Sequence, residues 1–212
     1  MTHSLHRQGT KENLTNDFTL FAIPAVGYNV EGSGPKRKKF LEIALRNNVV
    51  NVGASNMGNL AQYSPEELLE RVVDGQAMQV CFNNREDVVN VLKETVEAGI
   101  DISIVVQGIR EDVEACLAEA GLKPHTVNHS LGVWGKTDRL PEKDVLEITT
   151  MCGHALVSAN LVKQCIEDVI AGRKTAREAA KLLSAPCVCG IFNTDRAEAL
   201  LKRLAERAKG CC

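Results

Sequence analysis

The strongest constraint in this sequence is the alternation, between residues 18 and 131, of short apolar runs rich in β-branched residues with longer segments of helical periodicity. Such runs favour strands, which we expect at 18–25, 49–53, 77–82, 101–108 and 125–133. Helices are expected between them at 35–48, 64–75, 85–99 and 110–121. Because alternation at this spacing is typical of right-handed crossovers, the pattern predicts an α/β fold with a mainly parallel sheet of about five strands and flanking helices.

The last third of the chain changes character and predicts helices only. An apolar stripe from Val157 to Ile170 indicates a helix that ends near Gly172, and Thr175 with Glu178 forms a capping box for a shorter return helix. A terminal helix is expected at 195–208, and the ambiguous segment 140–151 favours a helix slightly over a strand. We therefore divide the chain into an α/β core with an N-terminal arm, 1–140, and a Cys-rich helical subdomain packed on it, 141–212.

Composition narrows the class of protein. A net charge of −2 argues against a general nucleic-acid binder, which usually has a strongly basic face. Neither a run long and apolar enough to span a membrane nor a segment typical of a secretory signal is present, so we expect no membrane partner and a cytoplasmic location. The eight cysteines should then be reduced thiols rather than a disulfide framework.

The expected parallel sheet also predicts where a ligand would bind, because the loops at the carboxyl ends of parallel strands gather at one edge. In the first such loop, Gly32, Ser33, Gly34 and Lys36 precede a helix whose free N–H groups and dipole favour an anion. Seven Lys or Arg against four acids in residues 1–50, a local excess of +3, agree with a small anionic ligand. The alternative is a plain flexible turn before a basic helix face.

Further candidates follow the other predicted strands. Asn83 and Arg85 are expected at the same edge, with Arg85 as a second anion clamp beside Lys36. His129 is the candidate general acid or base, because an imidazole titrates near neutral pH. A histidine that only holds a loop together is the competing interpretation. The segment with His3, His6 and Arg7 precedes any regular structure and has no assigned role.

Two cysteine stretches carry the most specific chemistry, "TTMCGHALVSANL" at 149–161 and "SAPCVCGIFN" at 184–193. A helix rise of ~1.5 Å and an extended rise of ~3.3 Å per residue allow a helical hairpin to bring Cys187 and Cys189 beside Cys152 and His154. Three thiolates and an imidazole suit zinc, and soft sulfur ligands equally suit an iron–sulfur cluster. The hypothesis requires the four side chains to lie within about 10 Å of one another, since zinc bonds are only about 2.0–2.3 Å long.

Alternatives to a metal centre stay open. Cys152 or Cys187 could be a covalent nucleophile with His154 as its base, as in a transferase or hydrolase, or the thiols could be inert packing groups. A non-catalytic small-molecule sensor or accessory subunit is a third possibility, with the terminal helices forming a homo-oligomer interface. Cys116 and Cys165 lie on apolar helical faces and are expected in the core. Cys211 and Cys212 are interpreted as adventitious.

Overall fold

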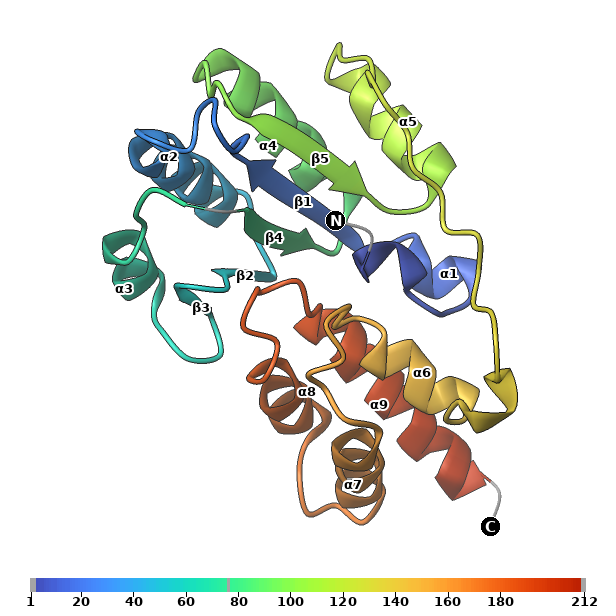
Figure 1. The fold of residues 1–212 in the computed structure, drawn as a ribbon. Helices are drawn as coiled ribbons and strands as arrows, with labels where there is room; N and C mark the ends of the chain where they lie inside the picture. The colour runs from blue at the N-terminus through green and yellow to red at the C-terminus, as the bar shows by residue number, and fades with distance from the viewer. Residues whose placement is uncertain (1–2, 76, 211–212) are drawn as a thin grey trace.

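The computed structural model describes residues 3–75 and 77–210, so Cys211 and Cys212 lie outside the described residues. The chain begins with a 3-10 turn, His3–His6, and a short helix, α1 (Lys11–Leu14). A sheet region with four further helices follows, and the chain ends in four helices on the other side of the sheet (Figure 1). Among the described residues, no helix is both long and apolar enough to cross a membrane.

The described residues contain a five-stranded sheet in the order β3-β2-β4-β1-β5, and every neighbouring pair is antiparallel. The strands are β1 (Phe18–Ile23), β2 (Asn51–Ala54), β3 (Gly58–Asn59), β4 (Met78–Phe82) and β5 (Ser103–Gln107). The predicted mainly parallel sheet is therefore wrong. Four strands were correctly placed, β3 was not predicted, and 125–133 forms an irregular exposed loop instead of a strand.

The crossover connections explain why the sheet is antiparallel although helices alternate with strands along the chain. Helix α2 (Ser33–Arg46) joins β1 to β2, but β4 lies between these two strands. Helix α4 (Arg85–Glu97) joins β4 to β5, and β1 lies between them. Each crossover connects strands of the same direction that are not neighbours, which is the connectivity of a split β-α-β unit. The sequence shows the crossovers but not the antiparallel strand inserted into each.

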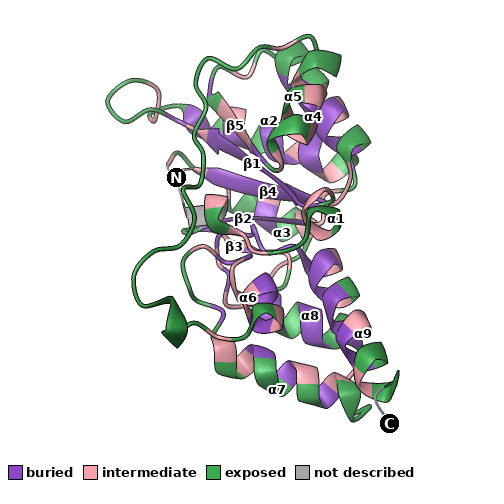
Figure 2. Ribbon diagram, turned by 90° about the vertical axis from the view of Figure 1, so that its right-hand side faces the viewer, coloured by how far each residue is buried: buried purple, intermediate pink, exposed green. Residues whose placement is uncertain are grey.

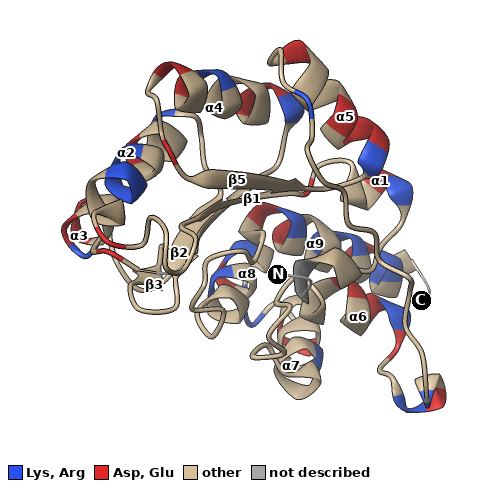
Figure 3. Cartoon of the chain, turned by 45° about the horizontal axis from the view of Figure 1, so that its top comes forward, with Lys and Arg blue, Asp and Glu red and all other residues tan. Residues whose placement is uncertain are grey.

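Both faces of the sheet are covered, which explains why its strands resemble those of a parallel sheet (Figure 2). Phe18, Leu20 and Ala22 of β1 join the core under α2, α4 and α5 (Arg110–Glu119). Phe21 points to the opposite face and belongs to the core of the C-terminal helices. Alternate side chains thus enter two different cores, so the strands carry no charged residue, whereas the helices carry charges of both signs (Figure 3).

The C-terminal helices agree with the predicted pattern. They are α6 (Lys143–Thr149), α7 (Ala159–Ile170), α8 (Ala176–Ser184) and α9 (Thr194–Gly210). Thr175 and Glu178 form the expected capping box of α8, and Ser64 with Glu67 forms another at α3 (Pro65–Glu70). Cys116 and Cys165 are buried in the two cores, as predicted. The cysteine stretches are the loops between α6 and α7 and between α8 and α9, so they lie on the face of the sheet that the C-terminal helices cover.

Candidate metal centre

The structure brings the two cysteine stretches together. The Cys187 and Cys189 sulfurs are 3.8 Å apart, and the Cys189 sulfur is 3.6 Å from Nδ1 of His154. The Cys187 thiol also lies near enough to Cys152 to lower the pKa of the Cys152 thiol. Cys187, Cys189 and His154 therefore contact one another across the two stretches, and Cys152 lies beside Cys187. The three cysteines are buried, whereas His154 is exposed and forms the solvent side of the cluster.

Three side-chain amides of the sheet hold the second stretch in place. Nδ2 of Asn59 donates to the carbonyl oxygen of Cys187 at 2.8 Å, and Nδ2 of Asn51 donates to that of Phe192 at 3.0 Å. With its side-chain amide oriented so that the nitrogen faces neighbouring carbonyls, Gln79 donates to the carbonyl oxygen of Cys189 at 3.1 Å. These bonds satisfy loop carbonyls that would otherwise be buried without a partner. Consequently the cysteine loop is fixed directly to β2, β3 and β4.

Close backbone contact fixes the same loop further. Gly190 has φ +74°, and a Cβ at this position would lie only 2.2 Å from the backbone nitrogen of Gly53 and 2.2 Å from the carbonyl carbon of Val52. A Cβ on Gly53 would in turn lie 2.9 Å from the backbone of Cys189. Both glycines are therefore required for the loop to lie directly on β2.

The first stretch forms a loop that wraps around the Cys152 sulfur. The Cys187 thiol is the main cause that lowers the pKa of Cys152 to about 6, and the backbone N–H groups of Leu156, His154 and Val157 add to the effect. These residues precede Ser158, the N-cap of α7. Thiolate stabilisation at Cys152 thus comes from a neighbouring thiol and the loop amides rather than from the first turn of α7.

The second stretch contains thiols of two kinds. A hydrogen bond from the Cys187 thiol lowers the pKa of Cys189 to about 6, with contributions from the Ile191 N–H and from His154. The pKa of Cys187 itself is raised, because its proton is held between the Cys152 and Cys189 sulfurs and because it is buried. The arrangement is therefore one S–H group flanked by two sulfurs that favour the thiolate form.

The contacts form a series and do not yet converge on one point. Within 3–75 and 77–210, no three His, Cys, Asp or Glu side chains are arranged as a ready-made metal site. A shared ion would need the cysteine side chains to rotate toward one common point. The roles of Cys152, His154, Cys187 and Cys189 as metal ligands stay a prediction.

The predicted anion loop is engaged by the protein's own carboxylate. The N–H groups of Gly32 and Gly34 donate to the two oxygens of Asp74 at 2.7 and 2.6 Å, and these bonds lower the pKa of Asp74. The Ser33 hydroxyl accepts a hydrogen bond from the Gly75 N–H, and Lys36 pairs with Asp101 at 3.0 Å. An external anion would have to displace Asp74, so anion binding there stays a prediction.

The remaining predicted residues do not gather with that loop. Because β1 and β4 are antiparallel, their carboxyl ends lie at opposite ends of the sheet. Lys36 and Arg85, which follow these strands, therefore do not form two sides of one anion clamp. Arg85 pairs with Glu119 at 2.6 Å, and Asn83 donates to Asp195 at 2.8 Å. The predicted gathering of five loops at one edge is wrong, because it depended on parallel strands. His129 lies in the exposed loop at 122–136.

Sequence reasoning missed the polar residues that position the site. Asn51 and Gln79 belong to short, otherwise apolar strands, whereas Asn59 lies in the two-residue strand β3, which was not predicted, and Asp74 follows α3. An amide inside an otherwise apolar strand was the available signal, because a buried polar group needs a partner. What that partner would be depended on which loop covers the strand, and this was not visible in the sequence.

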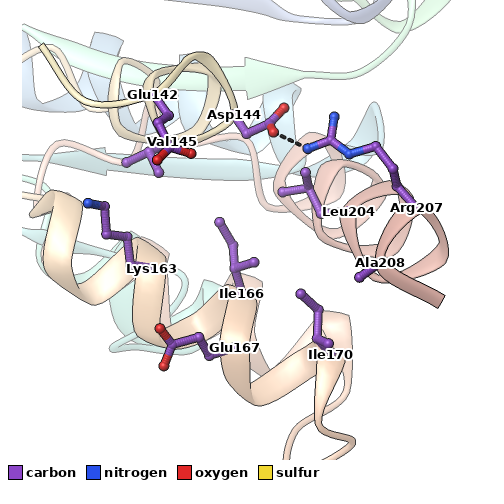
Figure 4. Close-up of a pocket in the computed structure, with 10 residues that line it drawn as sticks. All are labelled: Glu142, Asp144, Val145, Lys163, Ile166, Glu167, Ile170, Leu204, Arg207 and Ala208. Carbon is purple, nitrogen blue, oxygen red and sulfur yellow. Dashed lines mark hydrogen bonds and ion pairs between the residues drawn. The ribbon is translucent and has the colours of Figure 1, made fainter. Parts of the chain in front are cut away.

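A surface groove of about 360 Å³ lies among α6, α7 and α9 (Figure 4). Its apolar side chains include Val145, Ile166 and Leu204, and Asp144 pairs with Arg207 at its rim. None of the residues that line it is among the predicted site residues, so the groove is separate from the cysteine cluster.

Comparisons with protein-family models, with curated proteins and with solved structures found no match to this chain.

Proposed function

We propose that this chain binds a thiophilic metal ion, with Cys152, Cys187 and Cys189 as sulfur ligands and His154 as a nitrogen ligand. The observation that carries the proposal is the spacing of 3.8 Å between two sulfurs and 3.6 Å between sulfur and imidazole nitrogen. Zinc bonds of about 2.3 Å to sulfur and about 2.05 Å to nitrogen in a tetrahedron imply separations of about 3.8 and about 3.6 Å. The two measured contacts thus have the spacing of ligands that share one ion.

The protonation states support the same proposal. Two buried thiolates repel each other unless a hydrogen-bond donor or a cation lies between them, and the Cys187 thiol, whose pKa is raised, lies beside the other two sulfurs. A bound cation would replace the proton of this thiol, and all three sulfurs would then be ligands. The backbone amides around Cys152 and Cys189 would orient and stabilise the sulfurs in either state.

Among soft centres, the short spacing favours a single ion such as Zn²⁺ over a [4Fe–4S] cluster, whose thiolates each bind a different iron and are kept apart. A [2Fe–2S] cluster, in which two ligands share one iron, is distinguished from zinc by its absorption. The ligand set is Cys₃His with its imidazole on the exposed side. A closed set of this kind is typical of structural zinc. We infer that such a site operates in the reducing conditions of the cytoplasm, where free thiols persist.

The test is to purify the chain with and without oxygen and to determine bound metals by elemental analysis. We expect one zinc per chain and no absorption near ~400 nm, the region expected for an iron–sulfur cluster. Cys152→Ser, Cys187→Ser and Cys189→Ser should each lose most of the metal, and His154→Ala should weaken binding. Cys165→Ser is the matched control, because Cys165 is equally buried but lies in α7 away from the cluster. Wild-type protein that stays metal-free even after zinc titration would refute the proposal.

A second function is favoured by one specific contact. His154 lies beside Cys189, so the nearest nucleophile and base pair is Cys189 with His154, rather than the predicted pairs with Cys152 or Cys187. In metal-free protein this function predicts one fast-alkylating thiol at neutral pH that is lost in Cys189→Ser. Uniformly slow alkylation of all thiols would exclude it.

A further inference from the structure

The N-terminal arm contacts both cysteine stretches through Arg7 and Gln8. The Arg7 guanidinium donates to the carbonyl oxygen of Met151 at 3.3 Å and also to that of Ile191. The first carbonyl directly precedes Cys152, and the second lies two residues after Cys189. One side chain therefore bridges the two cysteine stretches.

A second bond ties the arm to the first stretch. The backbone N–H of Gln8 donates to the Thr150 hydroxyl at 2.9 Å. Nη2 of Arg196, at the start of α9, donates to the Gln8 carbonyl at 2.6 Å. The arm is thus joined to both stretches and to the helix that follows the second one.

The position of Arg7 is itself fixed by buried charge. Asp17, whose side chain is fully buried, pairs with Arg7 and with Arg196, the latter at 2.9 Å, and accepts from Asn193 at 3.0 Å. Two guanidinium groups thus share one buried carboxylate, which fixes both arginines in place. Arg7 also interacts electrostatically with the sulfurs of Cys81 and Cys187. The Arg7 guanidinium therefore lies near the thiol of one proposed ligand, Cys187.

We propose that Arg7 is a positioning residue that holds the two cysteine stretches at the spacing a shared metal ion needs, so that docking of the arm and metal affinity are coupled. This inference rests on the proposed metal-binding function. It assigns a role to the segment around His6 and Arg7 that the sequence left open. The coupling is reciprocal: a bound ion should hold the arm in place as much as the arm favours the ion.

The experiment measures zinc affinity by competition with a chromophoric chelator under reducing, anaerobic conditions. Loss of a residue that orients ligands typically lowers metal affinity by about 10–100-fold, and we expect this for Arg7→Ala. Arg7→Lys keeps the charge but lacks the planar fork that reaches two carbonyls, so it should recover only part of the loss. Thr150→Val, which removes the acceptor for Gln8, should weaken binding less and tests the same coupling if Arg7→Ala fails to fold.

Two controls separate positioning from a general loss of stability. Leu92→Ala destabilises the other core, under α4, and should leave zinc affinity unchanged. Arg110→Ala removes an exposed arginine paired with Glu114 and should also have no effect. As a further readout, zinc should slow hydrogen exchange at the Gln8 amide in wild type but not in Arg7→Ala, an effect that lost stability alone does not produce.

The outcomes distinguish this inference from the function on which it rests. Wild-type protein that binds zinc while folded Arg7→Ala binds it within about twofold, or zinc binding that leaves Gln8 exchange unchanged, would overturn the coupling and leave the metal function standing. Wild-type protein that binds no zinc would overturn the proposed function and the coupling together.

Discussion

Replacing Gly190 by alanine should separate the cysteine loop from the sheet. The left-handed backbone at φ +74° costs a non-glycine residue about 1–2 kcal/mol. The added Cβ would also lie 2.2 Å from the backbone of both Gly53 and Val52, and neither can rotate away. Overpacking of this kind costs about 1–3 kcal/mol. We therefore expect a total loss of about 3 kcal/mol in the free energy of unfolding.

Gly172 provides the matched control. It has φ +70° but nothing within 4 Å of an added Cβ, so Gly172→Ala should cost only the backbone component, about 1–2 kcal/mol. Chemical denaturation of both reduced, metal-free variants measures the difference, and for a chain of this size the Tm should fall about 2–4 °C per kcal/mol. Equal destabilisation by the two substitutions would refute the close contact between the loop and β2.

Three further predictions concern the polar groups around the site. Asn59→Ala leaves the Cys187 carbonyl without its partner and should lower the free energy of unfolding by about 1–3 kcal/mol, measured by denaturation; an unchanged value would contradict the bond. The pKa of Cys152 and of Cys189 is about 6 against an ordinary value of 9.0, so stability of the reduced, metal-free protein should rise from about pH 6 to about pH 9. A flat profile over that window, or one unaltered in Cys152→Ser, would refute the thiolate assignment. Asp74→Ala frees the N–H groups at the start of α2, so sulfate should raise the Tm of this variant more than that of wild type; an equal response would argue against anion binding there.

The elements of the fold were largely predictable, but their arrangement was not. Thr175 and Glu178 form the expected cap because capping depends on groups only a few residues apart. The direction of the strands was predicted wrongly because β1 is apolar on both faces. Such a strand is typical of a parallel sheet covered by helices on both sides, and here the C-terminal helices provide the second cover.

At the candidate site, too, local features were predictable from the sequence and the tertiary arrangement was not. Chain reach along the α7 and α8 hairpin was sufficient to predict that the stretches around Cys152 and Cys187 meet. The anion clamp of Lys36 and Arg85 failed because it needed strands of one direction, and the role of Asn59 and Gln79 depended on a loop more than a hundred residues away in the chain. Predictions that required only local spacing succeeded, whereas those that required strand neighbours did not.

The sequence by itself determined most of the helices, four of the strands and the meeting of the two cysteine stretches, because these follow from interactions and lengths along a continuous segment. It missed α1 and placed the end of α3 five residues too late. Only the tertiary structure decided the antiparallel strand order, the contact of Gly190 with Gly53 and the bridge from Arg7 to the cysteine loops. Those features depend on which apolar faces are buried against each other, and several arrangements satisfy the same local pattern. The free energy of packing the whole chain selects among them.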